Sequence, residues 1–233
     1  WKRPGYQLGL MLEEYFNKNP DSKGVVLESH GLFTWGDSAE ECYNTTVEII
    51  NKAIAWFEQK TGGVEIFGGV RHQSLDADTR RSIASTLMPR IRSFIDAGER
   101  KIGHFNDSDA VLEFVNSNKL EKLAALGTSC PDHFLRTKIR PIIIKFDPAK
   151  PNLDSVVAGL ANAFAAYRED YKAYYERCKH DNSPAMRDPN PVIYLIPGVG
   201  MLSFAKDKAT ARIAGEFYVN AINVMRGADT VST

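Results

Sequence analysis

Apolar residues recur along the chain with two different periods, and together they predict an α/β protein. Short apolar runs at 25–27, 139–146 and 192–196 are typical of buried strands. Apolar residues at helical spacing, with polar residues between them, predict amphipathic helices. The predicted helices cover residues 4–18, 38–60, 76–94, 109–116, 154–178 and 207–227.

The stretch at 24–43 places a histidine between a strand and a helix. After the apolar run, His30 and Gly31 lead into an expected tight turn at 32–36, and a helix begins after Ser38. Ser38 and Glu41 have the spacing of a capping box, in which each side chain accepts a hydrogen bond from a backbone N–H at the helix start. A histidine fixed in such a turn suits a metal ligand, but zinc needs three or four ligands, so spacing alone favours a structural histidine.

A polar segment with a glycine, at 98–105, predicts the boundary between two domains. We therefore expect domains at residues 1–97 and 98–233. The second expected domain repeats the pattern of the first, because a strand, a glycine turn and a capped helix follow one another at 192–227. Aligning Gly31 with Gly200 places Val199 opposite His30, an offset of 199 − 30 = 169, and one extra loop residue then aligns the helices. This echo indicates either a degenerate repeat that has lost its ligand or a unit common to all α/β proteins.

Composition excludes several classes of function. The chain has 233 residues, of which 43% are hydrophobic, so it can bury a real core. Lys+Arg and Asp+Glu both number 29, which argues against a nucleic-acid partner, and no apolar run is long enough to cross a membrane. Three scattered cysteines fit a reducing cytoplasm. The chain lacks an initiator Met, and we expect it to be a piece of a longer protein.

Several motifs carry a resemblance to known proteins. ESHGLFTWGDSAEECY, at 28–43, resembles the C-terminal metal-ligand motif of the class II (zinc-dependent) aldolase/adducin family. WKRPGYQLGL, GHFNDSDAVLEFVNS, LGTSCPDHFLRTKIRP and LIPGVGMLSFAKDK resemble the bifunctional rhamnulose-1-phosphate aldolase/short-chain dehydrogenase family, over nearly the whole chain. The resemblance implies the C-terminal part of an aldolase domain with αβα layers, followed by a connecting, second α/β lobe.

The same resemblance makes His30 the third zinc ligand and leaves the site incomplete. Family aldolases take two further ligands from a His-x-His pair and a catalytic Glu from upstream segments, and no His-x-His occurs here. We therefore assign no catalytic residue within this chain. The family's dehydrogenase binds NAD through a glycine-rich loop, which is also missing, so NAD would belong to a separate domain. In a complete site, zinc would polarise the hydroxyketone oxygens of the substrate as a Lewis acid.

A second polar cluster lies at 127–138. His133, Arg136 and Lys138 could bind an anion or a sugar phosphate near a helix start. Cys130 could instead act as a nucleophile activated by His133, which requires a geometry that adjacent sequence does not establish. The simplest interpretation is a capped loop that holds an Asp–Arg pair.

Two functional hypotheses follow. In the first, the chain is a fragment of an aldolase that cleaves a deoxyketose 1-phosphate, rhamnulose 1-phosphate, to dihydroxyacetone phosphate and lactaldehyde, in a parent that also carries the dehydrogenase. In the second, it is a non-catalytic connecting and oligomerisation module. A severed aldolase lobe should expose apolar surface, so we expect a homo-oligomer.

Overall fold

The computed structural model describes residues 2, 5–28, 30–96 and 98–231. The chain forms two compact units, Trp1–Val64 (unit 1) and Glu65–Thr233 (unit 2). This division differs from the expected boundary at 97/98, because α3 (Ala77–Ile95) and β3 (Ile102–Asn106) both belong to unit 2. Leu87 and Ile91 of α3 are fully buried in the core of unit 2. The segment predicted as a linker therefore holds a strand of the central sheet.

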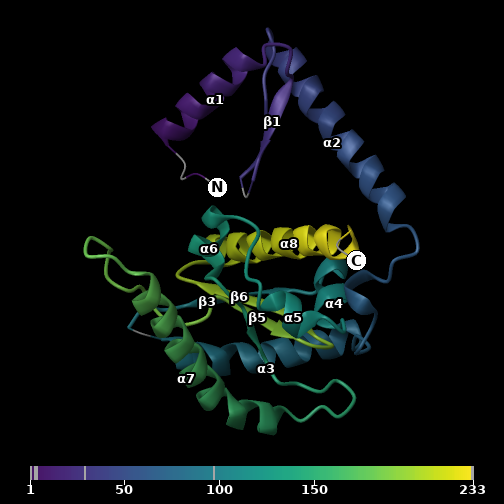
Figure 1. Ribbon diagram of the computed structural model, residues 1–233. Helices are drawn as coiled ribbons and strands as arrows, with labels where there is room; N and C mark the ends of the chain where they lie inside the picture. The colour runs from purple at the N-terminus through teal and green to yellow at the C-terminus, as the bar shows by residue number, and fades with distance from the viewer. Residues whose placement is uncertain (1, 3–4, 29, 97, 232–233) are drawn as a thin grey trace. The chain divides into compact units, whose positions relative to one another are not determined.

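Unit 1 consists of a hairpin and two helices (Figure 1). Its elements are α1 (Tyr6–Lys18), β1 (Gly24–Leu27), β2 (Gly31–Thr34) and α2 (Ala39–Thr61). The two strands pair in antiparallel fashion. The expected tight turn at 32–36 is wrong, because most of it is β2, where burial alternates along the strand. The helix predicted from residue 4 is α1, and residue 4 itself lies outside the described residues.

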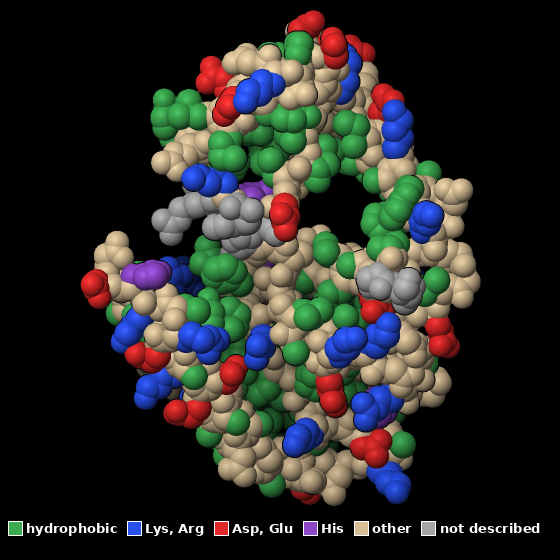
Figure 2. Space-filling view, viewed as in Figure 1, with side chains coloured by type: hydrophobic (Ala, Val, Ile, Leu, Met, Phe, Trp, Pro, Cys, Tyr) green, Lys and Arg blue, Asp and Glu red, His purple; other side chains and the backbone are tan. Residues whose placement is uncertain are grey.

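Helix α2 turns its most apolar stripe away from the hairpin. The sequence predicts that Tyr43, Val47, Ile50 and Phe57 face a core, but each is at least 37% exposed. The polar face of α2 contacts the hairpin instead, since the hydroxyls of Thr46 and Thr34 lie 2.6 Å apart. No described residue of α1 or α2 is buried. Figure 2 shows hydrophobic side chains gathered on the surface of unit 1.

Unit 2 is built on a four-stranded mixed sheet with the strand order β3-β6-β5-β4. β3 and β5 both pair antiparallel with β6, and β4 pairs parallel with β5. Its remaining elements are η1 (Ile66–Gly68), α4 (Asp109–Val115), α5 (Leu120–Ala124), α6 (Pro131–Thr137), β4 (Ile142–Ile143), α7 (Leu153–Cys178), β5 (Ile193–Ile196), β6 (Gly200–Ala205) and α8 (Lys208–Val231).

Helices cover both faces of this sheet, so unit 2 has three layers (Figure 1). Alternate residues of β5 enter different cores: Tyr194 packs with α3 and α7, whereas Leu195 packs with α4, α5 and α8. All four residues of β5 are buried, as expected for a strand covered on both faces. This arrangement confirms the predicted α/β class. None of the described helices is both long enough and apolar enough to span a membrane.

Two predicted segments of unit 2 differ from the structure. The strand expected over 139–146 is shorter in the structure, where β4 has two residues. Beyond β4, the Ile144 N–H donates one further hydrogen bond to the Leu195 carbonyl oxygen (2.9 Å). The polar stretch at 127–138, expected as a loop, contains α6, which begins with Pro131 at its first turn. Proline suits this position because its missing N–H has no helical partner there.

The strand–turn–helix echo of the sequence is a hairpin followed by a helix in both units. Leu27 pairs with Gly31 across β1 and β2, and Ile196 pairs with Gly200 across β5 and β6. These pairs are related by the predicted offset of 169. The segment after Gly200, like that after Gly31, forms the second strand of a hairpin.

The same offset holds at the start of the following helices. The Ser38 hydroxyl accepts a hydrogen bond from the Glu41 N–H (3.1 Å), and the Asp207 carboxylate accepts one from the Thr210 N–H (2.7 Å). Asp207 and Thr210 follow Ser38 and Glu41 by 169 positions each, so the prediction of one extra loop residue is wrong. That extra residue would have aligned apolar residues of α2 with apolar residues of α8, but the α2 residues are exposed.

Candidate functional site

His30 lies at the turn of the β1–β2 hairpin, where the sequence places it. Its N–H donates to the Leu27 carbonyl oxygen at 3.1 Å, which closes the turn. Its Nε2 lies 2.8 Å from the Lys2 carbonyl oxygen, which accepts the Nε2 proton. A neutral imidazole protonated at Nε2 carries its lone pair on Nδ1, the tautomer that binds a metal through Nδ1. The Leu27 contact thus holds the backbone of His30, and the Lys2 contact orients its ring.

The residues that the structure describes do not fit a zinc ion by themselves. No group of three His, Cys, Asp or Glu side chains is close enough to hold a metal within the described ranges. Zinc sites need three or four such ligands, and His30 supplies one. Any complete zinc centre built on His30 would require ligands from other residues.

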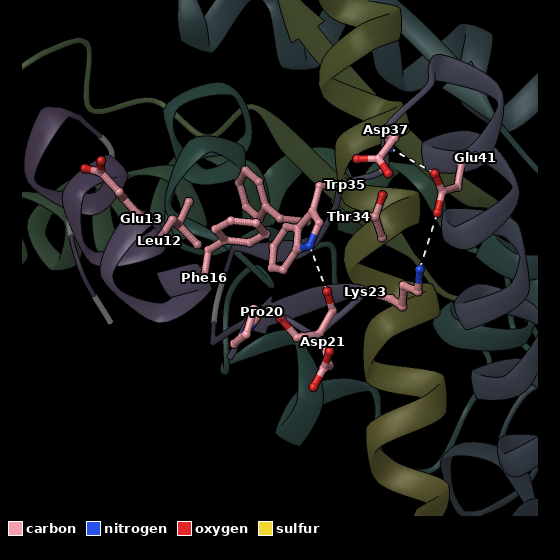
Figure 3. Close-up of a pocket in the computed structure, with 13 residues that line it drawn as sticks. Leu12, Glu13, Phe16, Pro20, Asp21, Lys23, Thr34, Trp35, Asp37 and Glu41 are labelled. Atoms are coloured by element: carbon pink, nitrogen blue, oxygen red, sulfur yellow. Dashed lines mark hydrogen bonds and ion pairs between the residues drawn. The ribbon is translucent and has the colours of Figure 1, made fainter. Parts of the chain in front are cut away.

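A pocket of about 640 Å³ lies beside the hairpin in unit 1 (Figure 3). Its wall includes Phe16 of α1 and Trp35, whose rings meet edge to face at 5.6 Å. The indole N–H of Trp35 donates to the Ser22 carbonyl oxygen at 2.8 Å. These contacts hold α1 against the hairpin. His30 is not among the residues that line this pocket.

Glu41 is one of the acidic residues that line the same pocket. Its carboxylate accepts a hydrogen bond from the Asp37 N–H (2.9 Å) and pairs with Lys23 at 3.3 Å. The Asp37 N–H, and then Lys23, lower the pKa of Glu41. The predicted capping box is therefore present in altered form: Ser38 caps as expected, but Glu41 reaches back to Asp37 rather than to Ser38.

The three residues predicted to bind an anion are divided by the structure. Arg136 and Lys138 line one pocket of about 220 Å³ in unit 2, and His133 does not. The His133 ring instead lies 4.6 Å from that of Phe217, and its Nδ1 lies 3.4 Å from the Ser129 hydroxyl. No observation tests Cys130 as a nucleophile, which stays a prediction.

Lys138 has an unusual backbone and an unusual environment. It ends α6 with φ +66° and ψ +175°, a region that residues with side chains rarely adopt. Its Nζ donates to the backbone carbonyl oxygen of Asp188 and lies 4.4 Å from the centre of the Tyr171 ring. Burial lowers the pKa of Lys138. The Thr137 hydroxyl donates to the Lys138 carbonyl oxygen at 2.9 Å and helps to fix this conformation.

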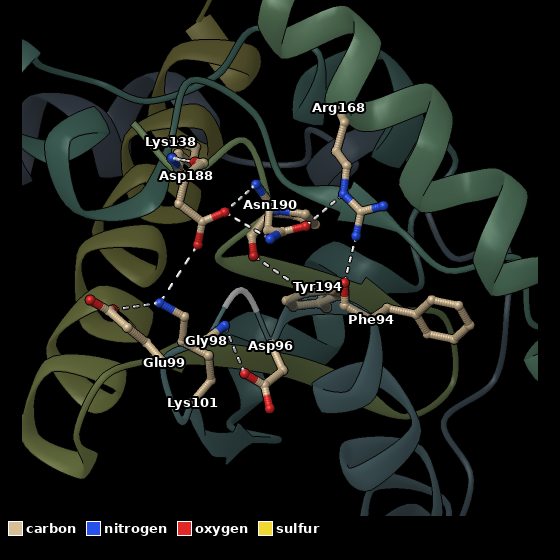
Figure 4. Close-up of polar contacts among 11 residues, drawn as sticks. Phe94, Asp96, Gly98, Glu99, Lys101, Lys138, Arg168, Asp188, Asn190 and Tyr194 are labelled. Atoms are coloured by element: carbon tan, nitrogen blue, oxygen red, sulfur yellow. Dashed lines mark hydrogen bonds and ion pairs between the residues drawn. The ribbon is translucent and has the colours of Figure 1, made fainter. Parts of the chain in front are cut away.

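Asp188 organises the polar wall of the pocket (Figure 4). Its carboxylate accepts hydrogen bonds from the backbone and side-chain N–H groups of Asn190, at 2.9 and 2.7 Å. It also pairs with Lys101 at 3.6 Å, and Lys101 pairs with Glu99 at 3.3 Å. Arg168 donates to the side-chain oxygen of Asn190 at 2.8 Å, which anchors the loop to α7.

Three residues that line this pocket with Arg136 and Lys138 were not predicted from the sequence: Lys101, Arg187 and Asp188. They lie in two segments that were expected to be a linker and a loop. The adjacent charged residues Arg187 and Asp188 in a proline-rich loop could have indicated a binding site, since loops often carry binding residues.

Comparison with known proteins divides the chain in a similar way. Residues 82–233 match the family described as "Aldolase class II, second domain", and residues 1–56 match the family described as "Class II Aldolase and Adducin N-terminal domain". The gap between these matches contains the division after Val64.

A curated relative matches almost the whole chain. It is the "Uncharacterized oxidoreductase YuxG" of Bacillus subtilis (strain 168), with 35% identity over 226 residues. The match covers 97% of this chain but 33% of the relative, so the chain spans about a third of the length of that protein. No solved structure gives a significant match to the chain.

Proposed function

The chain belongs to the class II aldolase family, and from that premise we propose that it is part of a larger zinc-dependent aldolase. Unit 1 would be the C-terminal part of the aldolase domain, with His30 as one zinc ligand, and unit 2 would be the second domain. The proposed reaction cleaves a deoxyketose 1-phosphate, rhamnulose 1-phosphate, to dihydroxyacetone phosphate and lactaldehyde. The observation that carries the proposal is the oriented imidazole of His30 within the segment that matches the N-terminal aldolase family.

The chain's own contribution to this site is orientation of one ligand. The Leu27 and Lys2 carbonyl oxygens hold the His30 backbone and Nε2, as outer partners of a metal-bound histidine commonly do. The other ligands and the residue that moves the proton would come from elsewhere in the larger protein.

The larger protein would also carry a dehydrogenase domain that uses NAD. The relative that supports this part of the proposal is named an oxidoreductase, and about two thirds of its length lies outside the match. Oxidation of the lactaldehyde product would then follow cleavage within one polypeptide.

Release of dihydroxyacetone phosphate tests the proposal directly. The longer protein, incubated with rhamnulose 1-phosphate, should release it, and other ketose 1-phosphates tested in parallel define the sugar. His30→Ala should abolish this activity, whereas His180→Ala, which changes an exposed histidine in a loop of unit 2, should retain it. Equal activity of the His30→Ala variant would contradict the role of His30.

A second candidate function is a non-catalytic connecting and oligomerisation module. The exposed apolar stripe of α2 favours it, because such a stripe is usually covered by another protein surface. The two functions are separable in the 233-residue chain. A segment with a His-x-His pair would be added to the chain. Restored zinc binding and cleavage would support the aldolase function. A stable assembly that stays metal-free and inactive after the addition would support the connecting module.

A further inference from the structure

The small pocket of unit 2 carries more positive than negative charge. Four cationic side chains line it, Lys101, Arg136, Lys138 and Arg187, against the single carboxylate of Asp188. Lys101 is 15% exposed and already pairs with Asp188. The pocket therefore retains an excess of positive charge that an anionic ligand would neutralise.

Three of these cations are not paired with a carboxylate. The structure gives no ion pair for Lys138, Arg136 or Arg187 among the described residues. The Lys138 ammonium is held by a backbone carbonyl oxygen and an aromatic ring, and it shares the through-space attraction of the Asp188 carboxylate with Lys101. Arg136 and Arg187 are exposed at the rim. Two exposed guanidinium groups and a half-buried ammonium around one small space are the groups that bind phosphate best.

The conformation of Lys138 supports the same conclusion. Its φ of +66° is strained for a residue with a side chain, and glycine would avoid that strain. Strained residues of this kind concentrate at binding and catalytic sites. Here the strained backbone holds the only one of the three unpaired cations that is not exposed.

The remaining wall of the pocket is apolar. Its apolar lining comprises Ile95, Leu135, Pro191, Val192, Phe204 and Ala205. A volume of about 220 Å³ is small for an organic ligand, since typical ligand pockets exceed ~300 Å³. The combination of a cationic rim and a short apolar wall fits a phosphate group attached to a short carbon chain.

We propose that this pocket is a binding site for a small phosphomonoester dianion. A phosphate group carries a charge close to −2 at neutral pH, which a monocarboxylate does not match. All of the residues that line the pocket belong to unit 2, so the site does not use His30. Its test therefore does not depend on the proposed role of His30.

Calorimetric titration of the 233-residue chain tests this proposal. Dihydroxyacetone phosphate and inorganic phosphate serve as separate probes, with a chelator present to remove metal ions. We expect saturable binding with one site per chain. Arg136→Ala and Arg187→Ala should each weaken it about tenfold or more, because each removes a charge-assisted contact. These side chains are exposed, so the fold should tolerate their removal.

Arg81→Ala provides the matched control. Arg81 is an exposed arginine of α3 that lies about 20 Å along the helix from Ile95, and its loss should leave binding unchanged. Tighter binding of the ester than of inorganic phosphate would identify an organic phosphate as the ligand, and equal binding would identify free phosphate. Absence of saturable binding for both probes, or equal binding by wild type and both pocket variants, would overturn the proposal.

Discussion

His30 and Val199 occupy the same position in two hairpins of the same register. The N–H of each donates at 3.1 Å to the carbonyl oxygen three residues earlier, which is that of Leu27 for His30 and that of Ile196 for Val199. A glycine with φ +137° follows each of them. Val199 is fully buried and has no metal-binding group. We interpret the second hairpin as a repeat that kept the backbone of the first and has a valine where the first has a histidine.

Contacts between hairpin and helix extend this equivalence. The Thr34 hydroxyl of unit 1 donates to the Cys42 carbonyl oxygen at 3.5 Å, and the Ser203 hydroxyl of unit 2 donates to the Ala211 carbonyl oxygen at 2.7 Å. Both pairs are related by the offset of 169. The repeated segment therefore includes the first turns of the helix as well as the hairpin.

The two equivalent glycines predict unequal effects of the same substitution. Gly31→Ala and Gly200→Ala both force a residue with a side chain into φ +137°, at about 1–3 kcal/mol. A Cβ on Gly200 would also lie 2.7 Å from the Asn106 carbonyl oxygen, whereas no described atom beyond the two neighbouring residues lies within 4 Å of one on Gly31. Gly200→Ala should therefore lower the free energy of unfolding by roughly 2 kcal/mol more than Gly31→Ala does. Amide hydrogen exchange in each hairpin measures both losses, and equal losses would contradict the prediction.

The backbone of Lys138 predicts that glycine is better tolerated there than alanine. Both substitutions remove the amine, but only glycine adopts φ +66° without strain. Lys138→Gly should be more stable than Lys138→Ala by about 1 kcal/mol, in thermal or urea unfolding. An alanine variant as stable as the glycine variant would show that the backbone is not strained. Both variants should bind phosphate less tightly than wild type.

The N-cap of α3 predicts a loss of stability in acid. The Asp76 carboxylate accepts hydrogen bonds from the Thr79 hydroxyl and then from its N–H, at 2.6 and 2.9 Å, and these lower the pKa of Asp76. The folded state therefore favours the ionised form. This contribution is present above the pKa of the unfolded chain, about 4, and is lost as the pH falls through the lower folded value.

Melting temperatures between pH 6 and pH 3 test this prediction. Asp76→Asn keeps an acceptor for the helix start but does not titrate, so its melting temperature should fall less in acid than that of wild type. Asp78→Asn removes the same charge from the first turn, where the side chain is exposed, and should follow wild type. If the two variants behave alike, the Asp76 cap is not the titrating group.

The exposed stripe of α2 predicts self-association. Ile50 and Ile54 are nearly half exposed, and burying them against a second copy would remove apolar surface from water. Sedimentation velocity should show an oligomer whose share rises with protein concentration. Ile54→Lys should shift it toward the monomer, and Asn51→Lys, which adds the same charge to the exposed helix, should shift it less. A monodisperse monomer over the whole concentration range would contradict the prediction.

The long helices were predictable from the sequence to within a few residues because their apolar spacing is strong, whereas the short α6 was expected as a loop. α7 was expected over 154–178 and runs from Leu153 to Cys178. β3 was missed, because its sequence IGHFN mixes polar and apolar residues and its pairing with β6 joins segments about 100 residues apart. The stripe of α2 was misassigned because apolar spacing identifies a helix without showing which neighbour covers it.

The candidate sites were likewise predictable only where the signal is local in sequence. The turn position of His30 was predictable because a local motif surrounds it. Its contact with Leu27 lies beside that motif, and its contact with Lys2 comes from near the N-terminus. Arg136 and Lys138 were predictable from one short segment. The rest of their pocket comes from residues 95–101 and 187–210, which only tertiary structure brings together.

Zinc content is the most direct test of the central claim that His30 is a ligand in a class II aldolase. The longer protein should be purified as wild type and as the His30→Ala and His180→Ala variants. Its intact mass should be measured to show that the full-length chain is present. The account predicts about one zinc per chain in wild type and in His180→Ala, and loss of zinc in His30→Ala. A His30→Ala protein that is correctly folded and retains the full zinc content would contradict it.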